Sequence, residues 1–302
     1  MQRITASLIQ FKVEPMNIEK NLQKSYSLLS DCVKKTDSSL IVFPESFTTG
    51  FTPKGTVQEL WNAVDPIPGP TTDRAIKWAK EFNTYLCFPT YERGEEFPIV
   101  YNSAALIGPE GLLGVYRKTH PFPAERLAAG GWTTPGNKPF CMETPIGKIG
   151  IVICYDGDFP ELSRVTALMG AEIICRPSAF LRTYDQWELT NKARAYDNHV
   201  YWLATNLVGE DARGASFFGS SMIVHPSGQK MAQASGCDEF VWAELDPEPI
   251  KTISPSSSRK QNFDHLQDRN LKAYKNILNK GMSSFEPNKR IPIEKTGGDE
   301  LG

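Results

Sequence analysis

Short β-branched runs alternate along the first two thirds of the chain with stretches whose apolar residues recur at helical spacing. Strands are predicted at residues 4–10, 40–43, 85–88, 149–153, 172–175 and 200–206. Helices are predicted from about residue 17, and at 72–82, 160–169 and 187–198. In the first of these helices the apolar residues that share one face are Ile18, Leu22, Leu29 and Val33. Such alternation is typical of helices layered against a largely buried sheet, so the pattern predicts an α/β fold.

Other segments predict antiparallel strands, which would make the sheet mixed. The turn at 108–111 joins two strands as a hairpin, and the second of them closes at 116–120. Alternating runs at 220–224 and 240–245 flank a turn at 226–228 and have the pattern of antiparallel strands. We therefore expect one domain over residues 1–248.

The composition changes after residue 247, where Ser, Lys, Pro and Asn replace apolar residues. Such a segment has too little apolar surface to form a core of its own. We expect residues 249–302 to be an extended arm whose last dozen residues are disordered.

Composition and charge narrow the possible partners. The 302 residues are 40% hydrophobic and 11% aromatic, which is enough for a sizeable buried core. Thirty-three basic and 35 acidic residues leave a net charge of −2, so no whole-protein field favours nucleic acid or an anionic membrane. The first residues lack the features of a signal peptide, and no run of about 18 apolar residues occurs. A small-molecule partner and a cytoplasmic location are expected.

The cysteines and histidines do not have the spacing of a metal site. The six cysteines contain no C-x-x-C pair, and the four histidines have no i, i+4 partner. No glycine-rich segment carries the lysine of a phosphate-binding loop. We therefore expect neither a metal nor a cofactor, and most cysteines as buried, reduced thiols.

Three polar residues directly follow apolar, strand-like runs: Glu45, Lys118 and Cys154. Strand ends can present side chains rigidly into a crevice. Taken singly, such a glutamate or lysine is most often a surface residue. Together the three supply a proton carrier, a cation and a nucleophile, which are the groups that acyl transfer from an amide needs.

Cys154 also lies just ahead of a predicted helix start. The exposed N–H groups of a helix start and a neighbouring ammonium both favour a thiolate over a thiol. We expect Glu45 to act as the base, to protonate departing ammonia and then to activate the water that cleaves the thioester.

The motifs Pro44-Glu45, Tyr116-Arg-Lys118 and Ile153-Cys-Tyr-Asp156 resemble the nitrilase, or carbon–nitrogen hydrolase, superfamily, whose members use a Glu-Lys-Cys triad. The spacings of 73 residues from Glu45 to Lys118 and 36 from Lys118 to Cys154 are similar to those of the family. The resemblance covers roughly residues 3–246.

This resemblance implies a role for each matching position. Glu45 would be the general base, Cys154 the nucleophile, and Lys118 with the backbone N–H of Tyr155 the oxyanion stabilisers. Glu125 resembles a second family glutamate that orients the lysine and the substrate. The alternative for Glu125 is a surface carboxylate paired with Arg126.

The resemblance also implies an architecture: a four-layer α-β-β-α sandwich of two mixed sheets. Members of the family usually form dimers or higher homo-oligomers. Here the implied contacts are the helices at 160–169 and 187–198, with the C-terminal arms, here 249–286, crossing over to the partner subunit.

Within the family, the sequence from Cys154 to Glu161 looks more like the amidases than the nitrilases, which often follow the nucleophile with Trp-Glu. Branches that act on carboxylate-bearing substrates place an arginine where this chain has Asp158. An anion there would repel a substrate carboxylate, so we expect a neutral or cationic amide. Arg176 or Arg182 are alternative sources of positive charge, and Asp158 is equally compatible with a helix cap.

The resulting hypothesis is an amidase that hydrolyses a small-molecule carboxamide to a carboxylic acid and ammonia. Aromatic residues near the motifs can shape the acyl pocket or belong to the core: Phe51, Trp132, Tyr155, Tyr184 and Trp187. The alternatives are an N-carbamoyl amidohydrolase, a nitrilase or an acyltransferase with the same triad. A non-catalytic binding protein on the same fold is a further alternative, but such proteins commonly lose a triad member and this chain has all three.

Overall fold

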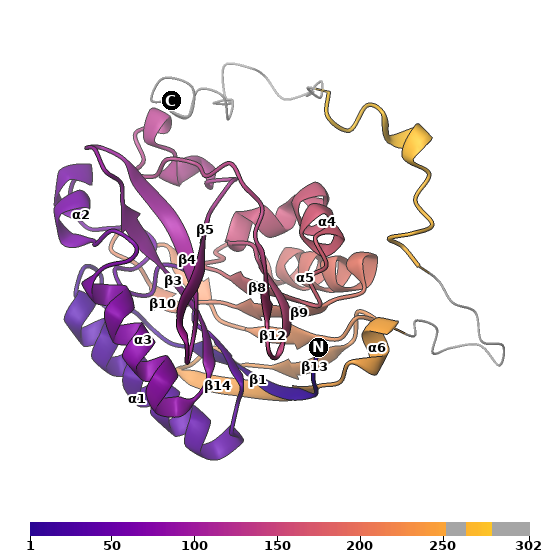
Figure 1. Ribbon diagram of the computed structural model, residues 1–302. Coiled ribbons are helices and arrows are strands. Elements are labelled where there is room, and N and C mark those ends of the chain that lie inside the picture. Colours follow the sequence, from indigo (N-terminus) through magenta and orange to yellow (C-terminus); the bar gives the residue numbers. More distant parts are fainter. Residues whose placement is uncertain (252–263, 280–302) are drawn as a thin grey trace.

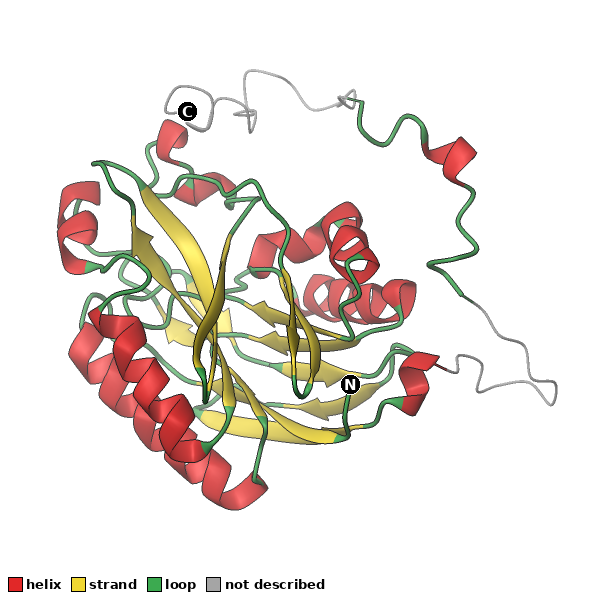
Figure 2. Ribbon diagram, in the orientation of Figure 1, coloured by secondary structure: helices red, strands yellow, loops and turns green. Residues whose placement is uncertain are grey.

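Two six-stranded sheets lie face to face, and helices cover the outer face of each (Figures 1 and 2). The computed structural model describes residues 1–251 and 264–279. Its layers follow the order helix, sheet, sheet, helix, which confirms the expected four-layer α-β-β-α sandwich of two mixed sheets.

The first sheet has three parallel strands at its centre and antiparallel strands at both sides. Its strands, in spatial order, are β14 (Glu239–Leu245), β1 (Ile4–Gln10), β2 (Leu40–Val42), β3 (Tyr85–Arg93), β4 (Val100–Gly108) and β5 (Gly111–Arg117). The carboxyl end of β2 leads to Glu45, and that of β5 leads to Lys118.

The second sheet repeats this arrangement, with parallel strands in the middle and antiparallel ones outside. Its strands are β13 (Lys230–Gln233), β12 (Met222–Val224), β9 (Tyr201–Thr205), β8 (Ile173–Pro177), β7 (Gly147–Ile151) and β6 (Cys141–Thr144). A separate two-stranded ribbon is formed by β10 (Val208–Glu210) and β11 (Ser216–Phe218). The carboxyl end of β7 leads to Cys154.

The helices are placed by their apolar faces and their caps. In α1 (Ile18–Thr36) the Asn17 side chain accepts a hydrogen bond from the N–H of Lys20 at 3.2 Å, and Leu22 and Leu29 are buried against the first sheet. The remaining helices are α2 (Val57–Ala63), α3 (Pro70–Phe82), α4 (Pro160–Leu168), α5 (Tyr184–Asn198) and α6 (Glu248–Lys251), with 3₁₀ turns η1 (Pro123–Glu125), η2 (Leu127–Ala129), η3 (Cys154–Asp158) and η4 (Leu271–Tyr274). Helices α1 and α3 cover the first sheet, and α4 and α5 cover the second (Figure 1).

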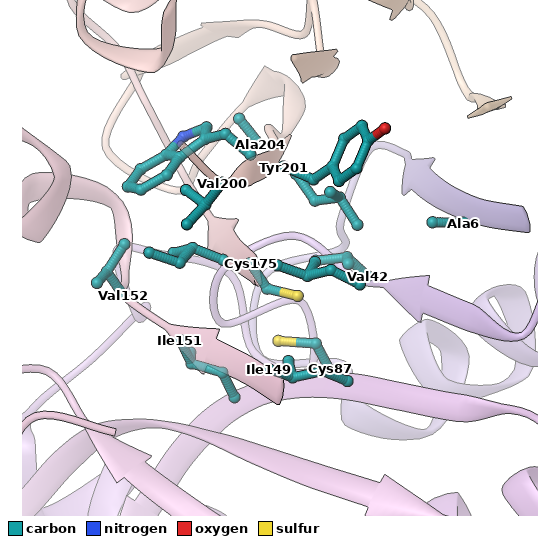
Figure 3. Close-up of a cluster of buried hydrophobic side chains, with 14 of the residues drawn as sticks. Ala6, Val42, Cys87, Ile149, Ile151, Val152, Cys175, Val200, Tyr201 and Ala204 are labelled. Carbon is teal, nitrogen blue, oxygen red and sulfur yellow. The ribbon is translucent and has the colours of Figure 1, made fainter. Parts of the chain in front are cut away.

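The main core lies between the sheets, because alternate residues of a strand point to opposite faces. Leu8 and Val42 point into the space between the sheets, whereas Ile9 and Ile41 pack under the helices. Figure 3 shows this inter-sheet core, in which the sulfur atoms of Cys87 and Cys175 point toward one another. Of the predicted thiols, four are buried: Cys32, Cys87, Cys154 and Cys175.

The runs at 220–224 and 240–245 do form antiparallel strands, β12 and β14, but these strands lie in different sheets. Strand β12 forms its hairpin with β13, a short and mostly exposed strand that the sequence pattern does not reveal. Strand β14 joins the other sheet, where Leu245 is opposite Ile4 and Glu239 is opposite Gln10. Pairing with β1 turns Val241, Ala243 and Leu245 of β14 toward the core between the sheets.

The described part of the arm, residues 264–279, contacts the middle of α4 and the end of α5 in the same chain. The N–H of His265 donates to Nε2 of His199 at 2.9 Å, and Arg164 donates to the His265 carbonyl at 3.1 Å. The last dozen residues, for which we expected disorder, lie outside the described residues. Within residues 1–251 and 264–279, no helix has both the length and the apolar character needed to cross a membrane.

Candidate active site

Three residues from separate segments meet at the carboxyl ends of the two sheets. Glu45 follows β2, Lys118 follows β5, and Cys154 begins the turn after β7; all three are buried. Nζ of Lys118 donates to Oε1 of Glu45 at 2.7 Å, and the charges of both residues act on the Cys154 thiol. The structure therefore brings together the groups that the sequence singled out.

Glu125 completes a buried ion cluster. It lies in η1, and its Oε2 accepts from Nζ of Lys118 at 2.6 Å. Burial alone would lower the pKa of the Lys118 ammonium, but Glu125 and Glu45 outweigh it and hold that pKa well above its ordinary value. Lys118 is thus a permanent cation between two carboxylates. The partner of Glu125 here is Lys118, not a surface arginine.

Burial has the opposite effect on the Glu125 carboxyl. It raises the pKa of Glu125, and although Lys118 opposes that rise, the negative charge of Glu45 adds to it. Two carboxylates that share one ammonium hold one excess negative charge. A cluster of this kind readily accepts a proton.

Two residues that the sequence did not reveal orient the glutamates. Nδ2 of Asn102, on β4, donates to Oε1 of Glu45 at 2.7 Å and to Oε1 of Glu125 at 3.1 Å. The backbone N–H of Ala179 donates to Oε2 of Glu45 at 2.7 Å. Nothing in the local pattern at 102 or 179 marks them, because their partners come from distant parts of the chain.

The nucleophile turn η3 holds Cys154 in a left-handed conformation, with φ of 45°. Such a backbone is costly for a residue other than glycine and persists only where surrounding contacts impose it. The buried Asp156 supplies some of these contacts: Oδ2 accepts from the Ile153 N–H at 2.9 Å and from the Tyr116 hydroxyl at 2.7 Å, and Oδ1 accepts from the His120 N–H at 2.9 Å. Asp156 thereby ties the turn to the end of β5, beside Lys118.

The expected thiolate preference of Cys154 is wrong for the resting site. Burial, followed by the Glu45 carboxylate, raises the pKa of the Cys154 thiol, and the cations Lys118 and Arg176 offset only part of that rise. The resting group is therefore a thiol that needs a base. Glu45 is the carboxylate whose charge acts on it most strongly.

A small pocket adjoins Cys154, with a volume of ≈ 10 Å³, which is room for about one water molecule. Its lining consists of Phe51, Phe122, Cys154, Tyr155, Ala179, Phe180, Leu181 and Arg182. Two of the five predicted aromatic residues, Phe51 and Tyr155, thus lie at the pocket.

The other predicted aromatics lie farther back. Trp132 packs edge-on against Phe51 at a centroid distance of 5.9 Å, and its indole N–H donates to the Tyr91 hydroxyl at 2.8 Å. Trp187 is fully buried, and its N–H donates to the Ser220 carbonyl at 2.8 Å. Trp187 is therefore a core residue and not a wall of the described pocket. A sequence reveals that a residue is aromatic, but it does not reveal the direction in which the ring points.

Asp158 does not present a free negative charge. Its Oδ1 lies 3.2 Å from Nη2 of Arg176, and its Oδ2 lies 2.6 Å from Nη2 of Arg182. The repulsion on which we based a neutral or cationic substrate is therefore offset by two guanidinium groups. A preference for cationic substrates loses its physical basis.

No group of three or more His, Cys, Asp or Glu residues within residues 1–251 and 264–279 is arranged to hold a metal ion. The acidic groups beside Cys154 are occupied instead by Lys118 and Asn102.

Comparisons with known proteins identify the family and the fold. The family model "Carbon-nitrogen hydrolase" matches residues 5–253. A nitrilase of Pyrococcus abyssi is 32% identical over 80% of this chain and 90% of its own length, and an omega-amidase of Xenopus tropicalis is 32% identical over 84% and 92%. The crystal structure of a carbon-nitrogen hydrolase from Helicobacter pylori G27 superposes with a TM-score of 0.80 at 25% identity, covering 93% of this chain and 100% of that one.

Proposed function

The chain belongs to the carbon–nitrogen hydrolase family, and we propose that it is an amidase that converts a small linear carboxamide into a carboxylic acid and ammonia through a thioester on Cys154. It is a hydrolase of carbon–nitrogen bonds other than peptide bonds. The observation that carries the proposal is the buried cluster of Lys118 with Glu45 and Glu125 beside the Cys154 thiol.

The proposed reaction begins with proton transfer from Sγ of Cys154 to the Glu45 carboxylate. The sulfur then attacks the amide carbon, and the Lys118 ammonium with the N–H of Tyr155 stabilises the oxygen anion that forms. The carbon–nitrogen bond breaks, and Glu45 gives its proton to the departing nitrogen, which leaves as ammonia. Water loses a proton to Glu45, attacks the thioester and releases the acid, and the proton returns to the sulfur.

Lys118 is suited to this role because it is a fixed cation at the reacting centre. Glu125 and Asn102 hold the ammonium and the base in place in a buried site, where charges interact strongly. In this proposal Glu125 is therefore a positioning group for the cation, and Glu45 carries the proton.

The pocket favours a short, uncharged acyl group. Its volume of ≈ 10 Å³ leaves little room beside the sulfur, its lining is mostly apolar, and the Arg182 guanidinium in that lining disfavours a cation. We therefore propose a neutral amide as the substrate, rather than a cationic one.

An ammonia-release assay tests the proposal with short aliphatic, aromatic and amino-acid amides, a ureido compound and a nitrile. Activity is expected on short aliphatic amides, and hydroxylamine should intercept the acyl group as a hydroxamate. Cys154→Ala should abolish both signals and the acyl adduct seen by mass spectrometry, whereas Cys237→Ala, at an exposed thiol, should change neither. Carbon dioxide release from the ureido compound alone, or turnover of the nitrile alone, would replace the amidase assignment.

We also propose that the chain forms a homodimer through the helices that follow the nucleophile. Helices α4 and α5 pack against each other and present large apolar side chains to solvent: Val165, Leu168, Met169, Leu189 and Tyr196. Side chains of this kind gathered on two adjacent helices are typical of a surface that another protein covers.

A further inference from the structure

A fully buried arginine lies behind the nucleophile turn. Arg176, at the end of β8, has 0% exposure, and three of its four hydrogen-bond partners are neutral: the Cys154 carbonyl (2.9 Å from Nε), Asn191 Oδ1 (2.6 Å from Nη1) and Thr190 Oγ1 (2.9 Å from Nη1). Its one carboxylate partner is Asp158, at 3.2 Å, which it shares with Arg182. Burying a cation is costly unless its charge is compensated. Much of the Arg176 charge is left uncompensated within the protein.

Arg176 donates hydrogen bonds to both ends of the nucleophile turn η3. Nε holds the carbonyl of Cys154, the first residue of the turn, and Nη2 holds the side chain of Asp158, the last. Between them a Cβ on Gly157 would lie 2.2 Å from Nε, so only a glycine leaves room for the guanidinium. The contact is therefore made to the part of the backbone that carries the left-handed Cys154.

Two aromatic rings and two polar side chains of α5 contact the guanidinium group. It lies 5.2 Å from the ring centroid of Trp187 and 5.7 Å from that of Phe180. Thr190 and Asn191 anchor it to α5. This explains the place of Trp187, which supports Arg176 and also packs against Phe180 at a centroid distance of 5.1 Å.

We propose that Arg176 is a positioning residue for the hydrolase reaction, which fixes the nucleophile turn and supplies a buried positive charge that favours the Cys154 thiolate. The proposal rests on the proposed thioester chemistry at Cys154. The charge of Arg176 lowers the pKa of that thiol, against burial and Glu45, which raise it. Arg176 thus acts on the thiol in the same direction as Lys118.

The test compares three variants of the full-length protein: Arg176→Gln removes the charge, Arg176→Lys keeps a charge but loses the planar fork, and Asp158→Asn removes the partly compensating anion. Two readouts are measured from pH 6 to 10: kcat and KM on the best amide, and the alkylation rate of Cys154 by a small haloacetamide, followed on its own peptide by mass spectrometry. The matched control is Arg164→Gln, because Arg164 on α4 also donates to backbone carbonyls, those of Asp197 and His265.

For Arg176→Gln we expect kcat to fall by about tenfold or more with KM little changed, and alkylation to shift to higher pH. Arg176→Lys should restore much of the alkylation profile but not kcat, since one ammonium cannot hold both ends of the turn. Asp158→Asn should shift alkylation to lower pH, in the opposite direction. Arg164→Gln should leave both profiles as in the wild type.

Unchanged alkylation and kcat in Arg176→Gln, with only a lower melting temperature, would overturn the proposal. If Arg176→Gln does not fold, the partly exposed Asp158 serves as the second test, and an upward or absent shift of the alkylation profile in Asp158→Asn is the contrary result. Failure of the proposed function is distinguishable, because Cys154→Ala would then retain turnover while the alkylation readout would still respond to Arg176.

Discussion

Lys118 illustrates how a single residue serves both catalysis and stability. Its ammonium is the partner of two buried carboxylates, Glu45 and Glu125, at 2.7 and 2.6 Å. Removing one partner of a buried ion pair leaves an uncompensated charge, which costs about 3–5 kcal/mol. Lys118 is therefore not a residue that can be deleted without a structural consequence.

We predict that Lys118→Ala lowers turnover by about a hundredfold or more, equivalent to about 3 kcal/mol of transition-state stabilisation. It should also lower the free energy of unfolding at neutral pH. Lys118 is the main group that lowers the pKa of Glu125, so the variant should shift that pKa further upward.

The sign of the pH effect follows from that shift. A carboxyl whose pKa is raised in the folded state favours folding at low pH and loses that contribution as pH rises through the folded pKa. Denaturant titrations of Lys118→Ala should therefore approach the wild type as pH falls. The control is Glu125→Gln in the Lys118→Ala background, because it removes the carboxyl group that titrates and should largely suppress this pH dependence. Near-normal turnover in Lys118→Ala would contradict the role of the lysine.

The sequence predicts the chemistry-bearing residues of the site but not the residues that orient them. Glu45, Lys118 and Cys154 are recognisable because each follows an apolar run and because their order resembles a family. Asn102 and Ala179 reach Glu45 across 57 and 134 residues of sequence. Their roles depend on strand neighbours and on a backbone N–H direction, and neither leaves a trace in a local pattern.

At the scale of elements, local patterns predict strands better than strand partners. The run at 4–10 is β1, with the expected bounds, because both its faces are buried and apolar residues dominate it. Strand β13 was missed because its residues are mostly exposed and it is short. The pairing of β14 with β1 joins the two ends of the domain, which no local signal encodes.

One element, the described arm segment, is anchored through His199. Nε2 of His199 accepts the N–H of His265, and the two rings stack at 4.4 Å. Burial, then the neighbouring His265, lowers the pKa of His199 to about 4, with Arg164 acting in the same direction and Asp264 opposing it. Only the neutral ring can accept this hydrogen bond.

We predict that the arm loosens in acid. Because the folded pKa of about 4 lies below the ordinary 6.5, the stability from neutral His199 is present above 6.5 and is lost as pH falls toward 4. Limited proteolysis within 264–279 should accelerate over that range, together with a fall in melting temperature. His199→Gln, which keeps an acceptor but does not titrate, should flatten both curves, and an unchanged pH slope in that variant would count against the anchor.

At the scale of the whole molecule, the sequence predicted an α/β domain, and the family resemblance supplied the two-sheet sandwich. Neither the strand order nor the contact of Cys87 with Cys175 across the sheets follows from periodicity (Figure 3). Periodicity defines which face of a strand is apolar, but it does not identify the sheet that covers that face.

The apolar surface of α4 and α5 leads to a prediction about assembly. Leu189, with 68% exposure, and Met169, with 45%, belong to this surface. If a second copy covers it, a charge placed there must be buried without a partner, which is strongly unfavourable. Leu189→Glu and Met169→Glu should therefore convert a dimer into monomers in sedimentation velocity at micromolar concentration.

Phe97→Glu is the matched control, because Phe97 is 51% exposed but lies in the loop between β3 and β4, away from α4 and α5. It should leave the sedimentation coefficient unchanged. Helix α5 also carries Thr190 and Asn191, which hold Arg176 behind the nucleophile turn. Loss of the dimer should consequently lower kcat as well. A wild-type protein that sediments as a monomer would contradict the proposed dimer.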